Sequence, residues 1–344
     1  MKKILPFILV GLSFCSCKTE LVYLSVKEPA PISIPMHSKK AGIINRSNVS
    51  DENKKLDEID QIFSAEGKNI DKDGSLECIR GLNDELQSIK RFDYVKVLDK
   101  VDLKTSGAGF FPTELSWDEI RKICFENEVD ILFVVEMFDT DSKIAYSLIP
   151  TTIRTPLGDI PATEHQASLA TVVKSGFRIY EPKNKYVIDE NTLTDQITIS
   201  KRGISPLAAA RALVGRKEAV KASAYHIGKD YAKSIEPYWI RVSRDYYVKG
   251  NDNFRTATRL ARTGNWDKAA ELWKKETMNV DGKLAGRGCY NMAIISEING
   301  ELDIAIEWAQ KSYENYNNKL ALQYLRILKN RKAQNNKLKK QQQE

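Results

Sequence analysis

Two ten-residue segments near the C-terminal end of the chain share one pattern. Gly264–Trp273 aligns with Gly300–Ala309, which begins 36 residues later, with glycine first, a bulky residue third and alanine sixth. Small and apolar residues recur at helical spacing upstream of each glycine, as in Ala257, Leu260 and Ala261. Such a repeat is typical of stacked helical hairpins, because one hairpin cannot bury its apolar face alone. The C-terminal region is therefore predicted to be all-α.

The repeated pattern resembles tetratricopeptide repeats, whose period is about 34 residues. Glycine fits a turn that needs a positive φ, and alanine fits a point where two helices cross closely. The resemblance implies two repeats over residues 251–315, within a domain at residues 250–330. Asn253 and Cys289 stand where the family usually has tryptophan, and no proline closes either repeat. The positions that carry the signature are Gly264, Trp266, Ala269, Trp273, Gly300, Leu302, Ala305 and Ala309.

Two repeats are fewer than the roughly three that a free-standing solenoid needs. Residues 318–332 are predicted to form a capping helix. The two repeats are expected to pack against the preceding domain or against a partner. A plain helical bundle is the alternative interpretation. The resemblance further implies that residues 250–330 bind a protein, because tetratricopeptide helices hold peptides or neighbouring domains in a groove.

The N-terminal segment has the layout of a secretory signal peptide. Two lysines precede a mainly apolar run, Ile4–Leu12, which is much shorter than the roughly 20 residues of a spanning helix. The segment ends in Cys17 after the small Ser16, and this ending resembles a bacterial lipobox. The resemblance implies that residues 1–16 are removed and that Cys17 carries a covalent lipid. An ordinary signal peptide with incidental cysteines and a buried N-terminal helix are the alternatives.

A lipid on Cys17 implies a protein that is anchored to a membrane without crossing it. No later stretch reaches the roughly 18 consecutive apolar residues of a spanning helix. Residues 17–40 are then the lipidated N-terminus and a tether. The expected location is the bacterial outer membrane, on the periplasmic side or at the cell surface.

Residues 41–248 are predicted to form an α/β domain, because apolar strand patterns alternate with helical ones in its first half. Ser116 has the position of an N-cap, and Glu119 completes a capping box three residues later. Near-continuous apolar runs such as 130–137 are typical of strands covered on both faces. The expected strands here are 41–47, 94–98 and 130–137, with helices over 75–89 and from 116.

The second half of this domain reads as further strands and one long helix. Lys183 and Asn184 suit a hairpin turn, and Ser205-Pro206 is a typical helix start that Glu236-Pro237 ends. The expected strands are 168–180, 185–189, 195–200 and a closing strand at 238–248. A separate strand is expected at 21–26, ahead of the domain.

This order of elements resembles the small α/β domains of envelope lipoproteins, such as the curli-secretion lipoprotein and the N-terminal domain of the Tol-associated translocation protein. The lipobox, the α/β domain and the C-terminal repeats together resemble a family of Bacteroidetes lipoproteins. The expected fold class is an α/β (α+β) N-terminal domain followed by an all-α, tetratricopeptide-like domain.

The strongest metal-like pattern is Asn69–Glu77, which imitates the first nine positions of a calcium-binding EF-hand loop. Arg80 stands where the loop needs a bidentate glutamate, so a solvated loop leading into a helix is expected instead. His37, His165 and His226 are too few and too scattered for a recognised metal or triad pattern. No catalytic residue, metal or cofactor is predicted, apart from the lipid on Cys17.

Several weaker candidates also have an ordinary structural interpretation. Asp139 and Asp141 are predicted to follow a strand end, where α/β sites often lie. Ser106–Gly109 reads as an ordinary loop. A set of aromatic residues could form a peptide- or glycan-binding face with Arg241 and Arg244, although core and sheet packing is the preferred interpretation. These aromatic residues are Tyr225, Tyr231, Tyr238, Trp239, Tyr246 and Tyr247.

Three cysteines remain after the signal segment: Cys78, Cys124 and Cys289. An odd number cannot be fully paired within one exported chain. Buried free thiols are the preferred interpretation, and a bridge between Cys78 and Cys124 stays open.

The 53 lysines and arginines exceed the 46 acidic residues, which gives a formal net charge of +7. The excess lies in the signal segment and in residues 329–344, and the rest of the chain carries no net charge. This distribution argues against a nucleic-acid interface on the folded body. Residues 331–344 are predicted to be a solvated basic and Gln-rich tail, with contact to anionic lipid or polysaccharide as the alternative.

These observations favour a non-enzymatic, membrane-anchored scaffold that binds a protein through residues 250–330. The second hypothesis is an accessory component of a cell-envelope secretion or assembly complex. The third is an enzyme of cell-wall or glycan metabolism, which would need an acid/base pair that the sequence does not reveal.

Overall fold

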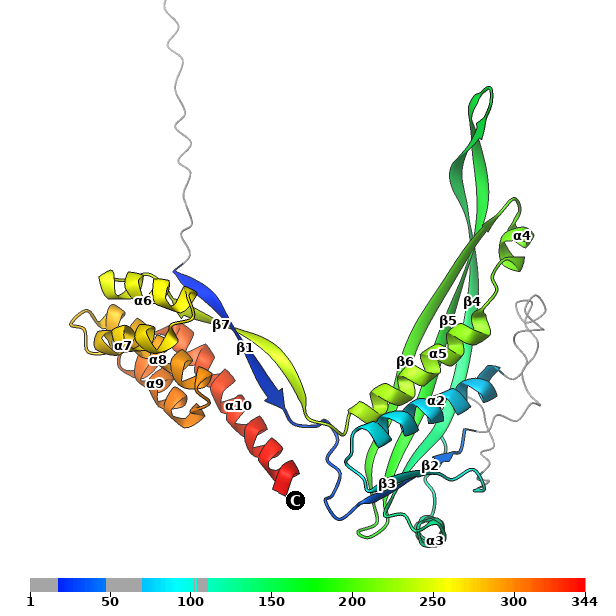
Figure 1. The fold of residues 1–344 in the computed structure, drawn as a ribbon, viewed down its shortest axis with the longest axis horizontal. Coiled ribbons are helices and arrows are strands. Elements are labelled where there is room, and N and C mark those ends of the chain that lie inside the picture. Colours follow the sequence, from blue (N-terminus) through cyan, green and yellow to red (C-terminus); the bar gives the residue numbers. More distant parts are fainter. Residues whose placement is uncertain (1–17, 48–69, 102, 104–110, 344) are drawn as a thin grey trace, which may run out of the picture. The chain divides into compact units, whose positions relative to one another are not determined.

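A computed structural model describes residues 18–47, 70–101, 103 and 111–343 of the chain (Figure 1). The chain divides into two compact units. The sheet unit lies within Ala30–Pro237, and the helical unit combines the described residues up to Pro29 with Tyr238–Lys340. The prediction of a mixed α/β region followed by an all-helical C-terminal region is confirmed at this level.

The sheet unit is built on one mixed five-stranded sheet with the order β3-β2-β4-β5-β6. Strand β2 runs parallel to both β3 and β4, whereas β4, β5 and β6 form antiparallel hairpins. The strands are β2 (Lys40–Asn45), β3 (Tyr94–Val97), β4 (Ile131–Thr155), β5 (Gly158–Glu181) and β6 (Tyr186–Gly203). The three strands predicted between residues 41 and 138 are therefore present, in a parallel arrangement.

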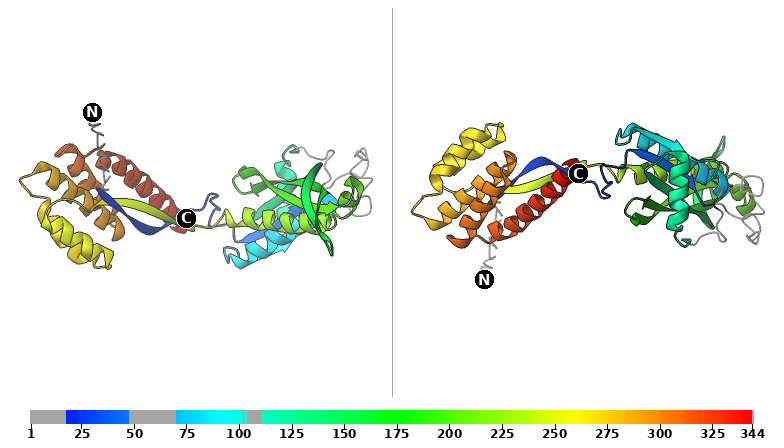
Figure 2. Two further views of the ribbon diagram at one scale, coloured as in Figure 1. Left: turned by 90° about the horizontal axis from the view of Figure 1, so that it is seen from above. Right: turned by 90° about the horizontal axis from the view of Figure 1, so that it is seen from below.

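Helices cover both faces of this sheet (Figures 1 and 2). Helices α2 (Ile70–Ser88) and α5 (Arg216–Lys233) lie on one face, where Tyr231 stacks on Phe177 with ring centroids 4.0 Å apart. Helix α3 (Trp117–Asn127) lies on the other face. The predicted capping box of Ser116 and Glu119 is present at its start.

Helices α2 and α5 cross with their backbones in contact. A Cβ atom added to Gly81 would lie 2.0 Å from the Tyr225 carbonyl oxygen, and one on Gly228 would lie 2.0 Å from that of Cys78. Glycine is needed here because any side chain would push the helices apart.

Several predicted elements differ from the structure. The strands expected at 185–189 and 195–200 form one continuous strand, β6. The single long helix expected from Ser205 is broken into α4 (Pro206–Arg211) and α5. Gly215 separates the two with a φ of 91°, a conformation that a continuing helix cannot contain.

Strands β4 and β5 extend beyond the rest of the sheet as a two-stranded arm, residues 149–164 (Figure 1). The pairing of β5 with β6 ends at His165 and Gly203, so the arm has no third strand among the described residues. Ile153, Leu157 and Ile160 are exposed there, and Leu157 at the tip is fully exposed.

The helical unit contains a two-stranded antiparallel ribbon and five helices in its described part. The ribbon pairs β1 (Thr19–Glu28) with β7 (Tyr238–Tyr247). The expectation that 238–248 closes the α/β sheet is wrong, because β7 pairs with β1 instead. The helices are α6 (Asp252–Arg262), α7 (Trp266–Glu276), α8 (Gly282–Ile298), α9 (Leu302–Glu314) and α10 (Lys319–Gln343).

Helix α10 covers the region of the predicted cap and continues through the basic, Gln-rich end of the chain. Tyr324, Leu325 and Leu328 enter the core of the helical unit. Among the residues that the structure describes, no helix is both long enough and apolar enough to cross a membrane.

Candidate functional site

The residues of the repeated pattern occupy matching environments in the helical unit. Gly264 and Gly300 join α6 to α7 and α8 to α9, with φ values of 81° and 80°. A residue with a Cβ rarely adopts this conformation, so both turns need glycine. The matched alanines, Ala269 and Ala305, are completely buried.

The other signature positions also pack inside this unit. Trp273 and its match Ala309 are completely buried, and Leu302 is buried at the start of α9. Trp266 is partly buried and packs against the core, with its ring centroid 5.6 Å from that of Tyr246. All eight signature residues therefore lie at turns or in the core, where they shape the unit and leave its outer surface to other side chains.

Helix α8 is the centre of the helical unit, and its residues from Ala285 to Glu297 are buried with the exception of Arg287. Helices α7 and α9 lie on either side of it, and β7 also lies against it. The Asn291 amide bonds the main chain of β7 twice: it accepts from the Tyr247 N–H at 2.7 Å and donates to the Tyr247 carbonyl at 2.8 Å. One face of α8 is therefore filled by a strand of the same chain.

A buried carboxylate of α8 also binds the elements that surround this helix. Glu297 of α8 is only 4% exposed, and Arg244 of β7 donates to its two oxygens at 2.8 and 3.0 Å. From α10, the Tyr324 hydroxyl donates at 2.5 Å and Arg331 at 2.6 Å. We call these four residues the Glu297 cluster.

The Glu297 cluster joins three elements that are distant in sequence. Burial raises the pKa of Glu297, but the hydrogen bonds from Arg244, Tyr324 and Arg331 outweigh burial, so its pKa lies below the usual value of 4.5. The pKa of Tyr324 is raised, by burial and by the charge of Glu297. The cluster is thus an ionised carboxylate with a full set of donors, which is typical of a structural lock.

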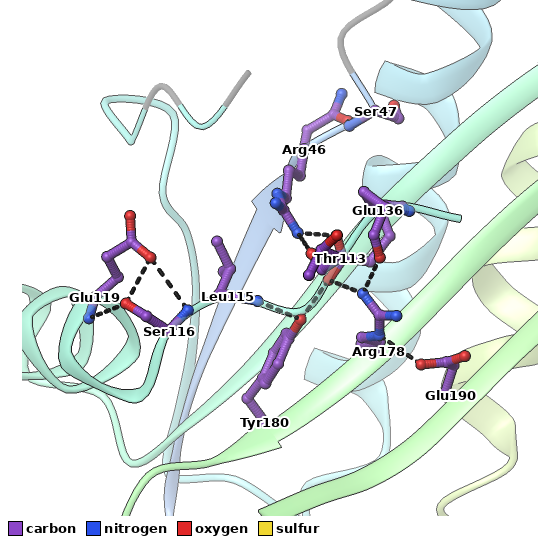
Figure 3. A network of polar contacts seen from close by, with 12 residues as sticks. Arg46, Ser47, Thr113, Leu115, Ser116, Glu119, Glu136, Arg178, Tyr180 and Glu190 are labelled. Carbon is purple, nitrogen blue, oxygen red and sulfur yellow. Dashed lines mark hydrogen bonds and ion pairs between the residues drawn. The ribbon is translucent and has the colours of Figure 1, made fainter. Parts of the chain in front are cut away.

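A second buried carboxylate lies in the sheet unit (Figure 3). Glu136 of β4 is 1% exposed, beside a register shift between Val135 and Met137. Arg46, just after β2, donates to it at 2.8 Å, and the Tyr180 hydroxyl of β5 donates at 2.6 Å. Arg178 of β5 lies 3.4 Å away. We call these four residues the Glu136 cluster.

The Glu136 cluster holds the segment that leads into α3 (Figure 3). Arg46 donates to the Thr113 carbonyl and Arg178 to the Pro112 carbonyl, both at 2.7 Å. The Leu115 N–H donates to the Tyr180 hydroxyl at 3.3 Å. These bonds fasten the segment across the end of β2, the edge of the sheet where ligands of α/β proteins often bind.

Burial would lower the pKa of Arg178, but its bond to Glu190 and the charge of Glu136 raise the pKa overall. The Nε of Arg178 donates to Glu190 at 2.6 Å, and its guanidinium lies over the Phe111 ring, 4.5 Å from the centroid. Each residue of this cluster therefore already has partners within the protein, so the geometry supports a positioning role for the cluster.

A shallow, open hollow of about 590 Å³ lies at the opposite end of α3. His37 contributes to its wall and lies 3.0 Å from Glu181. Its other lining residues include Arg121, Lys122, Phe125, Asp130 and Lys183. Asp130 accepts from the backbone N–H groups of Lys39 and Lys40, so its carboxylate holds the backbone at the start of β2.

The expected loop around residues 69–77 is wrong from Ile70 onward, because helix α2 already begins there. The Asp71 carboxylate is buried and accepts from the Thr140 hydroxyl at 2.5 Å, while Asp73 forms an ion pair with Lys217. Helical geometry points these groups in different directions, so they cannot wrap a cation as a loop does. In the described part of the chain, no cluster of three His, Cys, Asp or Glu side chains could hold a metal ion.

The structure also places the remaining candidates. Asp139 and Asp141 lie within β4, not after its end, because the strand continues to Thr155. Tyr231 and Tyr246 are buried in the two cores, whereas Tyr238 and Trp239 are exposed.

Cys78, Cys124 and Cys289 are free thiols in the structure, so Cys78 and Cys124 are not bridged. Burial raises the pKa of Cys78 and Cys124 to about 12 and that of Cys289 to about 11. Four predictions lie outside the described residues: the signal peptide at residues 1–16, lipidation of Cys17, the role of Asn69 and the loop at Ser106–Gly109.

Sequence reasoning missed both buried glutamate clusters. Glu136 interrupts the apolar strand 131–138, and Glu297 interrupts the apolar stretch from Met292 to Ile298. A single acid inside an apolar run is the signal that could have found them, because a buried charge needs partners.

Comparison with known proteins supplies a family. Residues 38–247 match the family described as Domain of unknown function (DUF8603). The chain belongs to this family. Residues 255–330 also match Domain of unknown function (DUF6340), which covers most of α6 to α10. Comparison with curated proteins finds no match.

Two solved structures show distant similarity. The chain is 9% identical to a PelC dodecamer from Paraburkholderia phytofirmans, with a TM-score of 0.24, covering 62% of this chain and 98% of that chain. It is 12% identical to a neuraminyllactose-binding hemagglutinin homolog from Helicobacter pylori, with a TM-score of 0.27, covering 59% and 88%. At these values, neither similarity assigns a ligand or an activity to this chain.

Proposed function

We propose that this protein is a lipid-anchored, non-enzymatic scaffold of the bacterial outer membrane, which binds a protein through tetratricopeptide-like helices in residues 250–330. The observation that carries the proposal is the equivalence of the two helical hairpins. Their turns have glycine at φ values of 81° and 80°, and their matched alanines are both fully buried. Repeated hairpins of this kind build extended binding surfaces.

The surface that remains for a partner is limited by the fold itself. Strand β7 already occupies one face of α8 through the Asn291 amide, so a peptide cannot bind there while the unit is folded. Helices α7 and α9 keep exposed positions, among them Ile304 and the repeat-matched pair Glu271 and Glu307. We therefore place the partner on the exposed sides of α7 and α9.

The test is photo-crosslinking in living cells. A photoreactive amino acid replaces Glu271, Ile304 or Glu307 in turn, and the exposed Lys90 of the sheet unit is the matched control. The proposal predicts one recurrent protein adduct from the helical positions and none from position 90, identified by mass spectrometry. If all three helical positions give only the adducts of the control, the scaffold proposal fails.

The anchor is tested separately. Cys17→Ala should abolish metabolic labelling with a fatty acid and release the protein from the membrane fraction, because two or more acyl chains are needed for stable anchoring. Labelling that persists in this variant would exclude Cys17 as the lipidated residue.

A second candidate is an accessory component of an envelope secretion or assembly complex. The arm favours it, because Ile153, Leu157 and Ile160 expose apolar surface on a ribbon that lacks a third strand in the described chain. A photoreactive residue at Leu157 separates the two candidates. Adducts from Leu157 alone favour an assembly component, and adducts from α7 and α9 favour the scaffold.

A further inference from the structure

The ribbon of β1 and β7 has two unlike faces. Val26, Arg244 and Tyr246 point to one face and are buried, and Val22 packs against the helical core on the same side. The register places alternate residues of both strands together, so the other face carries the residues between them. We call this second face the ribbon face.

The ribbon face is rich in aromatic and apolar side chains. Trp239 is 67% exposed, and Leu21 and Tyr23 are each 54% exposed. The guanidinium of Arg241 lies over the Tyr23 ring, 4.5 Å from its centroid. Lys27 lies opposite Trp239 in the register and adds a second positive charge.

Negative charge on this face is limited and already partnered. Asp245 lies opposite Leu21, and its carboxylate accepts from the Thr19 hydroxyl at 3.0 Å. Exposed tryptophan, tyrosine and leucine beside cationic side chains are typical of surfaces at the boundary between water and lipid.

The position of this face in the chain indicates what covers it. Strand β1 begins at Thr19, two residues after Cys17. At about 3.3 Å per residue, the Cα of Leu21 lies at most about 13 Å from that of Cys17, and the Cα of Tyr23 about 20 Å. A lipid on Cys17 would therefore hold the start of the ribbon at the membrane surface.

We propose that the ribbon face lies on the phospholipid surface in which the Cys17 lipid is embedded. This inference rests on the anchor of the proposed function and adds a second, non-covalent contact with the same membrane. The aromatic rings of Tyr23 and Trp239 enter the headgroup layer, and Arg241 and Lys27 face the lipid phosphates. The contact fixes the orientation of the ribbon, which a lipid chain alone would leave free.

The experiment uses the full-length lipidated protein in vesicles of phosphatidylethanolamine and phosphatidylglycerol. Mass spectrometry of the purified protein first establishes the lipid on Cys17. A chain without this lipid overturns the anchor itself, so that failure is distinct from a failure of the ribbon contact.

The readout is the quenching of tryptophan fluorescence by phospholipid that is brominated close to the headgroup. The contribution of Trp239 is the difference between the native chain and the Trp239→Phe variant, whose substitution lies at an exposed position. Trp308→Phe is the matched control, because Trp308 is partly buried in the helical core under Lys311. We expect the brominated lipid to quench most of the fluorescence that Trp239 contributes and little of the fluorescence that Trp308 contributes.

Two results would overturn the proposal. One is a Trp239 contribution that brominated lipid leaves unchanged in a protein shown to carry the lipid and to be bound to vesicles. The other is shielding of Trp239 from aqueous acrylamide in native membranes but not in lipid vesicles, because that pattern means that a protein covers the face.

Discussion

Each unit of this protein buries one glutamate between two arginines and a tyrosine hydroxyl, but the two clusters fasten different things. The Glu297 cluster joins β7, α8 and α10, so it closes the helical unit around its central helix. The Glu136 cluster joins β4 and β5 to the end of β2 and fastens the segment before α3. The first holds whole elements together, whereas the second positions one connecting segment.

The surroundings of the two clusters explain this difference. Arg244 binds both oxygens of Glu297, and almost every neighbour of that carboxylate lies within helices or strands. The arginines of the Glu136 cluster divide their bonds between the carboxylate and the carbonyls of Pro112 and Thr113. Removal of the Glu297 carboxylate should therefore destabilise the whole helical unit. Removal of the Glu136 carboxylate should destabilise only the segment before α3.

The largest expected effect comes from Glu297→Gln. This change leaves the buried Arg244 and the partly exposed Arg331 without their counter-charge, and breaking a buried pair in this way costs about 3–5 kcal/mol. Urea unfolding followed by tryptophan fluorescence should report the loss, since Trp266 and Trp273 pack in the same unit. Glu271→Gln on the exposed side of α7 is the control, and equal stability of the two variants would contradict a structural lock.

Glu136→Gln should have a smaller and more local effect. Arg178 keeps its bond to Glu190, so we expect a loss of about 1.5–3 kcal/mol, typical of one hydrogen bond to a charged group. Hydrogen exchange at the Leu115 amide should accelerate, because the Tyr180 hydroxyl then has only a neutral amide oxygen as its acceptor, which holds it less firmly than the carboxylate. The exposed Glu114→Gln variant of the same segment should exchange normally, and unaltered exchange in Glu136→Gln would refute the fastening role.

The same comparison predicts a dependence on pH. The pKa of Glu297 is lowered in the folded state, so its stabilisation is fully present above the usual value of 4.5 and disappears as the pH falls through the folded-state pKa. The stability of the helical unit should therefore fall more steeply with acid in the native chain than in Glu297→Gln. Urea midpoints from about pH 6 to about pH 3 test this, and parallel curves would speak against it.

The smallest effect is expected for Arg331→Met. Arg331 lies at the edge of the Glu297 cluster and is partly exposed, and Arg244 still pairs both carboxylate oxygens without it. A loss of about 1 kcal/mol follows from one partly solvated bond. Lys329→Met, two residues away on the exposed side of α10, should leave the urea midpoint unchanged. A loss as large as that of Glu297→Gln would mean that Arg331 is the main counter-charge.

Local signals in the sequence predicted local structure well. The capping box at Ser116 and the turns at Gly264 and Gly300 depend on a few neighbouring residues, and all three are present. The apolar runs predicted β2 and the first part of β4 for the same reason.

Features that depend on distant partners could not be predicted from the pattern. The alternation in 238–248 predicted a strand but not its pairing with β1, because alternation indicates a buried face and not a neighbour. The turn formers around Asp71 and Gly74 suggested a loop, yet Asp71 is satisfied inside a helix by Thr140, which lies 69 residues away. The partners of Glu136 and Glu297 could not be predicted for the same reason, since the arginines that bind them lie on other elements.

The pairing of β1 with β7 makes the sheet unit an insertion within the helical unit. Thr19 and Asp245 are bonded although they lie 226 positions apart in the sequence, so β1 must wait for the whole sheet unit to be synthesised before it has a partner. Contacts of such long sequence separation form late in folding. The helical unit can therefore be assembled only after the chain has emerged in full. Any chain cut short before Tyr238 would keep its N-terminal strand unpaired, with an exposed edge that marks incomplete synthesis.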